Sequence, residues 1–154
     1  MSIGLPVYNG EAFLREALTS LLAQSVGDFE IVISDNASTD GTEAICNEFA
    51  GRDPRIRYVR QSQNLGAVNN FKFVLTQARA DHFMWAAADD LWSENWIEKL
   101  LSVSREHGCI AVGSTEIVDK TGAVIRHPSS GRKIAFTGSR LRRRLAFFLE
   151  PSFL

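Results

Sequence analysis

The sequence has few cysteines, no long hydrophobic run and almost no net charge. Its two cysteines, Cys46 and Cys109, lie far apart and form no CxxC pattern, which favours a reducing, cytoplasmic setting. No segment is long and apolar enough to span a bilayer, and the amino terminus lacks the features of a signal peptide. A net charge of -1 gives no electrostatic reason to expect nucleic acid as a partner.

Several common catalytic motifs are also missing. The sequence contains no GxGxxG dinucleotide fingerprint, no Walker A loop, no HExxH and no GxSxG. The three histidines do not cluster along the chain. The 154 residues, of which 45% are hydrophobic and 23% charged, are typical of one globular domain.

Strand-like and helix-like segments alternate four times before a hairpin signal. This alternation predicts βαβ units, a mainly parallel sheet and right-handed crossovers. The turn at 119–122 indicates a hairpin. Asp40 with Glu43, and separately Ser93, are expected to cap helices, and Phe71, Val74, Leu75 and Ala78 to form an apolar helical stripe. The expected strands are residues 3–7, 29–34, 55–60 and 83–88.

The apolar run 83–88 ends in the pair Asp89-Asp90. Six uncharged apolar residues predict a strand that is buried on both faces. Adjacent carboxylates are hard to explain by packing, although they would also favour the positive end of a following helix. Ligands of open α/β sheets bind at the carboxyl ends of the strands. The pair therefore predicts a divalent metal that carries a diphosphate.

Other polar residues are expected at the same edge of the sheet. The first strand ends in residues 6–9 and the second at Asp35, and residues 64–66 follow the third. Each has a simpler explanation: Asp35 and residues 64–66 suit ordinary turns, and Glu11 suits the first turn of a helix. Tyr8 could be an aromatic residue at the core edge. Together they predict a cleft with three carboxylates, an aromatic ring and exposed backbone amides.

Four blocks of sequence together resemble the family 2 glycosyltransferases of the GT-A fold. They are residues 5–11 (LPVYNGE), 33–42 (ISDNASTDGT), 64–66 (NLG) and 88–90 (ADD), in the family's order. The resemblance covers about the first two thirds of the chain. It implies a Rossmann-like three-layer α/β/α fold with a mainly parallel central sheet. Residues 1–130 would then form the nucleotide-sugar-binding domain, and 131–154 a helical segment that begins an acceptor region.

The resemblance also implies roles for individual residues. It places the base against the first block and gives Asp35 a hydrogen bond from it, with Asp89 on the ribose. Mn²⁺ or Mg²⁺ would be the cofactor, which agrees with the preference of these ions for carboxylate oxygens. The implied nucleotide-binding residues are Pro6, Tyr8, Glu11, Asp35, Asn64, Gly66 and Asp89, and the implied metal ligand is Asp90.

The implied activity is sugar transfer with inversion from a UDP- or dTDP-sugar to a saccharide or lipid-linked acceptor. A bacterial surface polysaccharide would be the product, made in the cytoplasm or at the inner face of the membrane, with peripheral membrane contact. Ala88 stands where a strict DXD motif has its first acid. Glu116, Asp119 and Glu150 do not suit the catalytic base, so we expect the base beyond Leu154.

Two alternatives stay open. A sugar-phosphate nucleotidyltransferase would share the sheet and the carboxylate-bound metal. Such enzymes carry a glycine-rich basic loop after the first strand, whereas here no basic residue precedes Arg15. A non-catalytic module would use the same cleft to bind a nucleotide without turning it over.

Overall fold

The computed structural model describes residues 1–119 and 123–126. It divides into a compact unit at Met1–Glu98 and a second unit that begins at Lys99. The expected boundary at residue 130 lies outside the described residues. In chain order the elements are β1 (Ser2–Val7), α1 (Leu14–Leu22), β2 (Glu30–Asp35), α2 (Thr42–Arg52), β3 (Ile56–Arg60), α3 (Ala67–Thr76), β4 (Phe83–Trp85), α4 (Trp96–His107), β5 (Ile117–Val118) and β6 (Val124–Arg126).

The first unit is built on a parallel four-stranded sheet with the strand order β3-β2-β1-β4. The register ends with Val7 opposite Asp35 and Asp35 opposite Arg60. Consequently β1, β2 and β3 end at the same level, and the loops that follow them leave from one edge. The predicted parallel sheet is confirmed.

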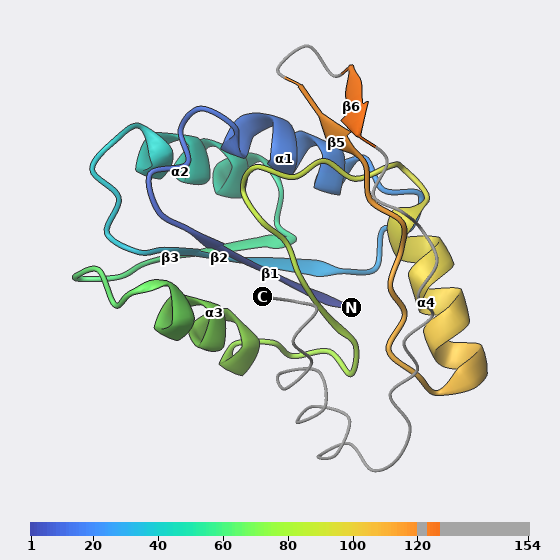
Figure 1. Cartoon of the computed structure of the whole chain (residues 1–154). Coiled ribbons are helices and arrows are strands. Elements are labelled where there is room, and N and C mark those ends of the chain that lie inside the picture. The colour runs from blue at the N-terminus through green and yellow to red at the C-terminus, as the bar shows by residue number, and fades with distance from the viewer. Residues whose placement is uncertain (120–122, 127–154) are drawn as a thin grey trace. The chain divides into compact units, whose positions relative to one another are not determined.

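Helices cover both faces of this sheet. In Figure 1, α1 and α2 lie on one side of β1, β2 and β3, and α3 lies on the other. Every residue of β1 is buried, as expected for a strand covered on both faces. Leu14, Leu18 and Leu21 of α1 are fully buried. The three-layer α/β/α arrangement is therefore confirmed.

Helix α3 departs from the expected apolar stripe. Its buried residues are Asn70 and Val74, whereas Phe71 is 42% exposed. The Asn70 side chain donates from Nδ2 to the Ser34 carbonyl oxygen over 2.9 Å and accepts from the Ser34 hydroxyl. The helix therefore packs a polar side chain against the end of the sheet, because hydrogen bonds with Ser34 offset its burial.

Strand β4 is shorter and more exposed than expected. It covers only Phe83–Trp85, all three residues are partly exposed, and the chain then continues through Ala86 as a loop. Of the strands that the structure describes, only β1 pairs with β4, so one edge of β4 carries no ladder. The prediction of a strand over 83–88 buried on both faces is wrong for this reason.

The two predicted helix caps fare differently. Asp40 Oδ1 accepts from the Thr42 amide over 3.0 Å at the start of α2, as expected. Glu43, however, pairs with Arg60 at 3.1 Å. At the start of α4, Ile97 N donates to Gln24 Oε1 over 3.0 Å, while the Ser93 hydroxyl donates to Asn95. A distant side chain thus takes the role that local sequence gave to Ser93.

In the second unit, β5 and β6 pair antiparallel, which confirms the expected hairpin in shorter form. The hairpin tip, residues 120–122, lies outside the described part. No helix within residues 1–119 and 123–126 is long and apolar enough to cross a membrane.

Close packing around Gly4 yields a stability prediction. A Cβ at residue 4 would lie 2.6 Å from Phe83 Cζ and 2.7 Å from Val74 Cγ2. We expect Gly4→Ala to lower the free energy of unfolding in urea by about 1–3 kcal/mol through overpacking. Gly51→Ala is the control, since no atom lies within 4 Å of where its Cβ would be. It should leave the free energy of unfolding unchanged or raise it by less than about 1 kcal/mol. Equal stability of both variants would contradict the packing.

Candidate functional site

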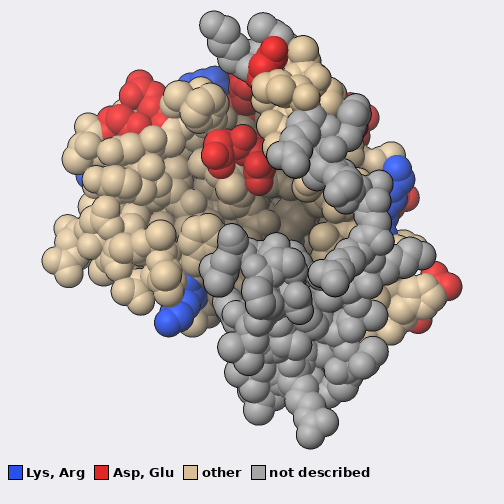
Figure 2. Space-filling model, viewed as in Figure 1, with Lys and Arg blue, Asp and Glu red and all other residues tan. Residues whose placement is uncertain are grey.

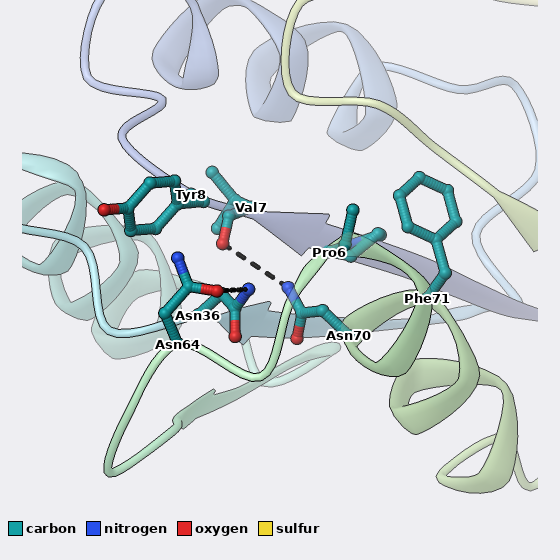
Figure 3. A pocket seen from close by; sticks show the side chains of 8 residues that line it. Pro6, Val7, Tyr8, Asn36, Asn64, Asn70 and Phe71 are labelled. Atoms are coloured by element: carbon teal, nitrogen blue, oxygen red, sulfur yellow. Dashed lines mark hydrogen bonds between the residues drawn. The ribbon is translucent and has the colours of Figure 1, made fainter.

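A pocket lies where β1 and β2 end, between their following loops and α3. Figure 3 shows it with its lining side chains. Its volume is about 180 Å³, smaller than the ~300–1,000 Å³ typical of pockets for whole drug-sized ligands, so it suits one part of a larger ligand. It is lined by Pro6, Val7, Tyr8, Asn36, Asn64, Ala67, Asn70 and Phe71.

Three of the expected site residues meet in this pocket. Pro6 and Tyr8 come from the end of β1 and the loop after it, and Asn64 comes from the loop before α3. Tyr8 is 49% exposed, which leaves it available to a ligand. The pocket therefore offers both an aromatic surface and a polar amide.

Asn36, Asn70 and Phe71 also line the pocket and were not expected there. Asn36 immediately follows Asp35, and its amide Nδ2 donates to Asn64 Oδ1 over 2.8 Å. Its Oδ1 accepts from the Leu65 amide, also over 2.8 Å. One signal was present in the sequence: Asn70 is a polar residue between the apolar positions of a helix.

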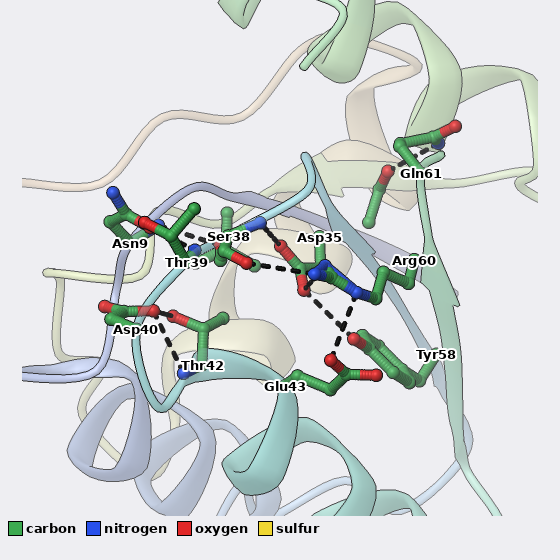
Figure 4. Close-up of polar contacts among 12 residues, drawn as sticks. Asn9, Asp35, Ser38, Thr39, Asp40, Thr42, Glu43, Tyr58, Arg60 and Gln61 are labelled. Carbon is green, nitrogen blue, oxygen red and sulfur yellow. Dashed lines mark hydrogen bonds and ion pairs between the residues drawn. The ribbon is translucent and has the colours of Figure 1, made fainter. Parts of the chain in front are cut away.

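Asp35 does not line the pocket. Its side chain is fully buried, and its Oδ1 accepts from the Ser38 amide over 2.8 Å. Its Oδ2 accepts from the Tyr58 hydroxyl over 3.0 Å and pairs with Arg60 at 3.4 Å (Figure 4). Both oxygens thus have partners within the protein. The expected contact of Asp35 with a base stays a prediction, and the residue beside it faces the pocket instead.

The Asp35 carboxylate changes the chemistry of Tyr58. Burial, together with the hydrogen bond to Asp35 and its charge, raises the pKa of Tyr58 above the ordinary 10.0. Besides its contact with Asp35, Arg60 donates to the Ser38 carbonyl over 3.0 Å and pairs with Glu43. These contacts hold the loop after β2 against β3.

Side chains also join the loop after β1 to the loop after β2; we call residues 9–11 and 38–42 the loop junction. Asn9 Oδ1 accepts from the Thr39 amide over 2.8 Å, and Glu11 Oε2 accepts from the Gly41 amide over 2.9 Å. Glu11 therefore lies outside the pocket and ties the loops together. Three further bonds of the junction run from the amides of Asn9, Gly10 and Glu11 to Ser38 Oγ, Thr42 Oγ1 and Asp40 Oδ2.

Gly66 shapes the pocket without lining it. Its φ of +78° lies in the region that favours glycine, and it is the residue directly before α3. Its amide donates to Asn64 Oδ1 over 2.8 Å. Gly66 thus turns the chain into the helix and helps to hold the Asn64 side chain.

The acid pair lies on an exposed turn that follows β4. It approaches the loop after β1, because Ala88 Cβ lies 3.4 Å from where a Cβ at Gly10 would be. Partial burial, followed by the neighbouring Asp89 charge, raises the pKa of Asp90. Figure 2 shows several separate patches of acidic side chains on the face in view. Within the described ranges, no three side chains of His, Cys, Asp or Glu gather as a metal cluster.

The chain is similar to proteins of one known family. A family model described as Glycosyl transferase family 2 matches residues 2–153. An uncharacterized glycosyltransferase of Rickettsia bellii is 32% identical over 132 residues, which are 82% of this chain and 19% of that protein. The putative teichuronic acid biosynthesis glycosyltransferase TuaG of Bacillus subtilis is 31% identical over 71% of this chain and 43% of that protein. The chain spans less than half of either relative.

Solved structures show the same likeness. TarS of S. aureus, residues 1–349 in complex with UDP-GlcNAc, matches with a TM-score of 0.65 and 25% identity over 70% of this chain and 32% of that one. The mannosyltransferase PcManGT of Pyrobaculum calidifontis, in complex with GDP-Man and Mn²⁺, matches with a TM-score of 0.57 and 26% identity over 60% of this chain and 28% of that one.

The raised pKa of Tyr58 predicts a loss of stability in alkali. Unfolded Tyr58 ionises near pH 10, whereas the folded protein keeps it protonated to higher pH. The stability that this difference supplies is present below pH ~10 and is lost as the pH rises through the folded-state pKa. Tyr58→Phe should therefore flatten the fall in unfolding free energy above pH ~10, measured with urea.

Tyr8→Phe is the control, because it removes the only other tyrosine of the chain. It should lose stability above pH 10 as the unaltered protein does. Equal alkaline slopes for Tyr58→Phe and the unaltered protein would contradict the bond between Tyr58 and Asp35.

Proposed function

The chain belongs to glycosyl transferase family 2, and we propose that it binds the nucleotide of a nucleotide-sugar donor together with a divalent cation. The observation that carries this proposal is the pocket of Tyr8, Asn36 and Asn64 at the carboxyl edge of the sheet, with an exposed acid pair on the turn after the neighbouring strand β4. Ligands of open α/β sheets bind at this edge. The base would lie in the pocket, and the diphosphate would extend toward Asp89-Asp90.

The acid pair fits a hard divalent cation. Two exposed carboxylates supply oxygen ligands, and phosphate oxygens and water can complete the coordination of Mg²⁺ or Mn²⁺. We assign Asp90 to the cation and Asp89 to the ribose. When bound, the cation would supply positive charge beside the departing diphosphate. The Mn²⁺ in the PcManGT complex supports this choice of metal.

The proposed reaction of the whole protein is transfer of the sugar with inversion at the anomeric carbon. In a direct displacement the acceptor hydroxyl attacks, the bond to the diphosphate breaks, and a base takes the hydroxyl proton. The residues of this chain would serve the donor half of that reaction: Tyr8 and the amides beside it hold the base, and the loop junction keeps them in place.

Donor and acceptor are also proposals. We propose a UDP- or dTDP-sugar as donor, which the UDP-GlcNAc complex of TarS supports. A saccharide or lipid-linked acceptor for a bacterial surface polysaccharide is supported by the name of TuaG. Such an acceptor would place the protein in the cytoplasm or at the inner face of the membrane, with peripheral contact.

Calorimetric titration with UDP, with and without Mn²⁺, tests this function. We expect Mn²⁺ to strengthen UDP binding by about tenfold or more, because the cation screens the diphosphate from the acid pair. Asp90→Asn should remove most of this gain. Asp81→Asn is the matched control, since Asp81 is also exposed but lies before β4, at the opposite end of the strand.

The outcomes separate the parts of the proposal. Absence of UDP binding under both conditions would overturn the nucleotide site. Binding that does not respond to Mn²⁺, or a full Mn²⁺ response in Asp90→Asn, would overturn the metal site and leave the nucleotide site standing. Binding without transfer, in a protein that contains its acceptor region, would favour the non-catalytic alternative.

A further inference from the structure

The polar edge of the pocket consists of the amides of Asn36 and Asn64, and backbone N–H groups fix how both are turned. Leu65 N donates to Asn36 Oδ1, and Gly66 N donates to Asn64 Oδ1, each over 2.8 Å. A backbone N–H can only donate, so the atom that it meets must be the amide oxygen. Neither amide can turn over without leaving a backbone N–H unpaired.

This arrangement leaves N–H groups for a ligand. Asn36 uses one Nδ2 hydrogen in its bond to Asn64 Oδ1. The other Nδ2 hydrogen of Asn36 and both on Asn64 have no partner in the part of the chain that the structure describes. In Figure 3 the Asn64 amide nitrogen points to the side of the pocket where Tyr8 lies.

Three oxygen atoms around this edge already accept a hydrogen bond. The Val7 carbonyl accepts from Asn36 N over 2.8 Å, and the Leu65 carbonyl accepts from Asn69 Nδ2 over 2.9 Å. Asn70 Oδ1 accepts from the Ser34 hydroxyl. The lining contains no Asp or Glu side chain. The edge therefore offers donors to a ligand and no carboxylate.

We propose that the Asn36 and Asn64 amides recognise acceptor atoms of a pyrimidine base, so that the pocket does not distinguish uracil from cytosine. The inference rests on the proposed nucleotide site and specifies its substrate class. Uracil and cytosine share the O2 acceptor, but N3 carries a hydrogen in uracil and accepts in cytosine. An edge of N–H donors can use O2 of either base, or cytosine N3, and needs no hydrogen on N3. A carboxylate there would instead select the N3–H of uracil.

Titration of UDP and CDP against the whole 154-residue chain tests the inference. We expect the two dissociation constants to agree within about threefold in the unaltered protein. Asn64→Asp keeps Oδ1 for the Gly66 amide and replaces Nδ2 by an oxygen of similar size. The new acceptor should accept from uracil N3–H and repel cytosine N3, so UDP should become favoured by about tenfold or more.

The ratio of the UDP and CDP dissociation constants distinguishes an effect on base recognition from an effect of the added charge. A new carboxylate repels both diphosphates equally, so this repulsion cancels in the ratio. Asn47→Asp, on an exposed position of α2, adds the same charge away from the pocket and should leave the ratio unchanged. Thermal unfolding of each variant checks that the fold is kept.

Each outcome decides. Similar constants for UDP and CDP, with a preference for UDP in Asn64→Asp, support the inference. A preference of more than about threefold for either nucleotide in the unaltered protein overturns it, even where Asn64→Asp binds too weakly to measure, and leaves the nucleotide site intact. An unchanged ratio in Asn64→Asp overturns it as well. Binding of neither nucleotide to the unaltered protein overturns both the inference and the proposed function.

Discussion

The in-register pairing of β1 with β2 is the constraint on which the site depends. The ladder ends with Val7 opposite Asp35, and the Asn36 amide adds one further bond to the Val7 carbonyl over 2.8 Å. Tyr8 and Asn36 therefore leave neighbouring strands at the same level and on the same edge. A slip of one residue would turn each side chain of β2 to the opposite face and place Asp35, with its charge, where Asn36 now lies.

Beyond that level the two loops have no ladder, and side chains replace it. Serine, threonine, asparagine and the acids of the loop junction bond to backbone amides of the opposite loop. Each exposed bond contributes about 1 kcal/mol or less, so the junction works as a set. The buried Asp35 carboxylate is different, because removal of a single partner leaves a desolvated charge. Arg60, Tyr58 and the Ser38 amide together offset the cost of burying it.

Periodicity and turn chemistry predicted the parallel sheet, the edge where the loops meet, and three pocket residues. They could not predict which of Asp35 and Asn36 faces the pocket. Successive residues of an extended chain point to opposite faces, so the result depends on the side chains that β3 brings to Asp35. Arg60 and Tyr58, which hold Asp35 inside, come from that distant strand. Likewise, Gln24 accepts from the backbone at the start of α4, and Asn70 of the pocket bonds to Ser34; both partners are far away in sequence. Local sequence patterns do not show which distant residues a side chain will contact.

The charged side chains near the site lie apart from the pocket. The pocket is lined by neutral groups only, while Asp35 lies inside the protein and Asp89 and Asp90 lie on the exposed turn. A neutral pocket suits a base, which carries no charge, but it gives nothing to a diphosphate. The acid pair repels a diphosphate, and partial burial, followed by the neighbouring Asp89 charge, already raises the pKa of Asp90. A contact between the acid pair and a diphosphate becomes favourable only when a cation lies between them. This is the physical reason to propose an anionic ligand and a divalent metal in one site.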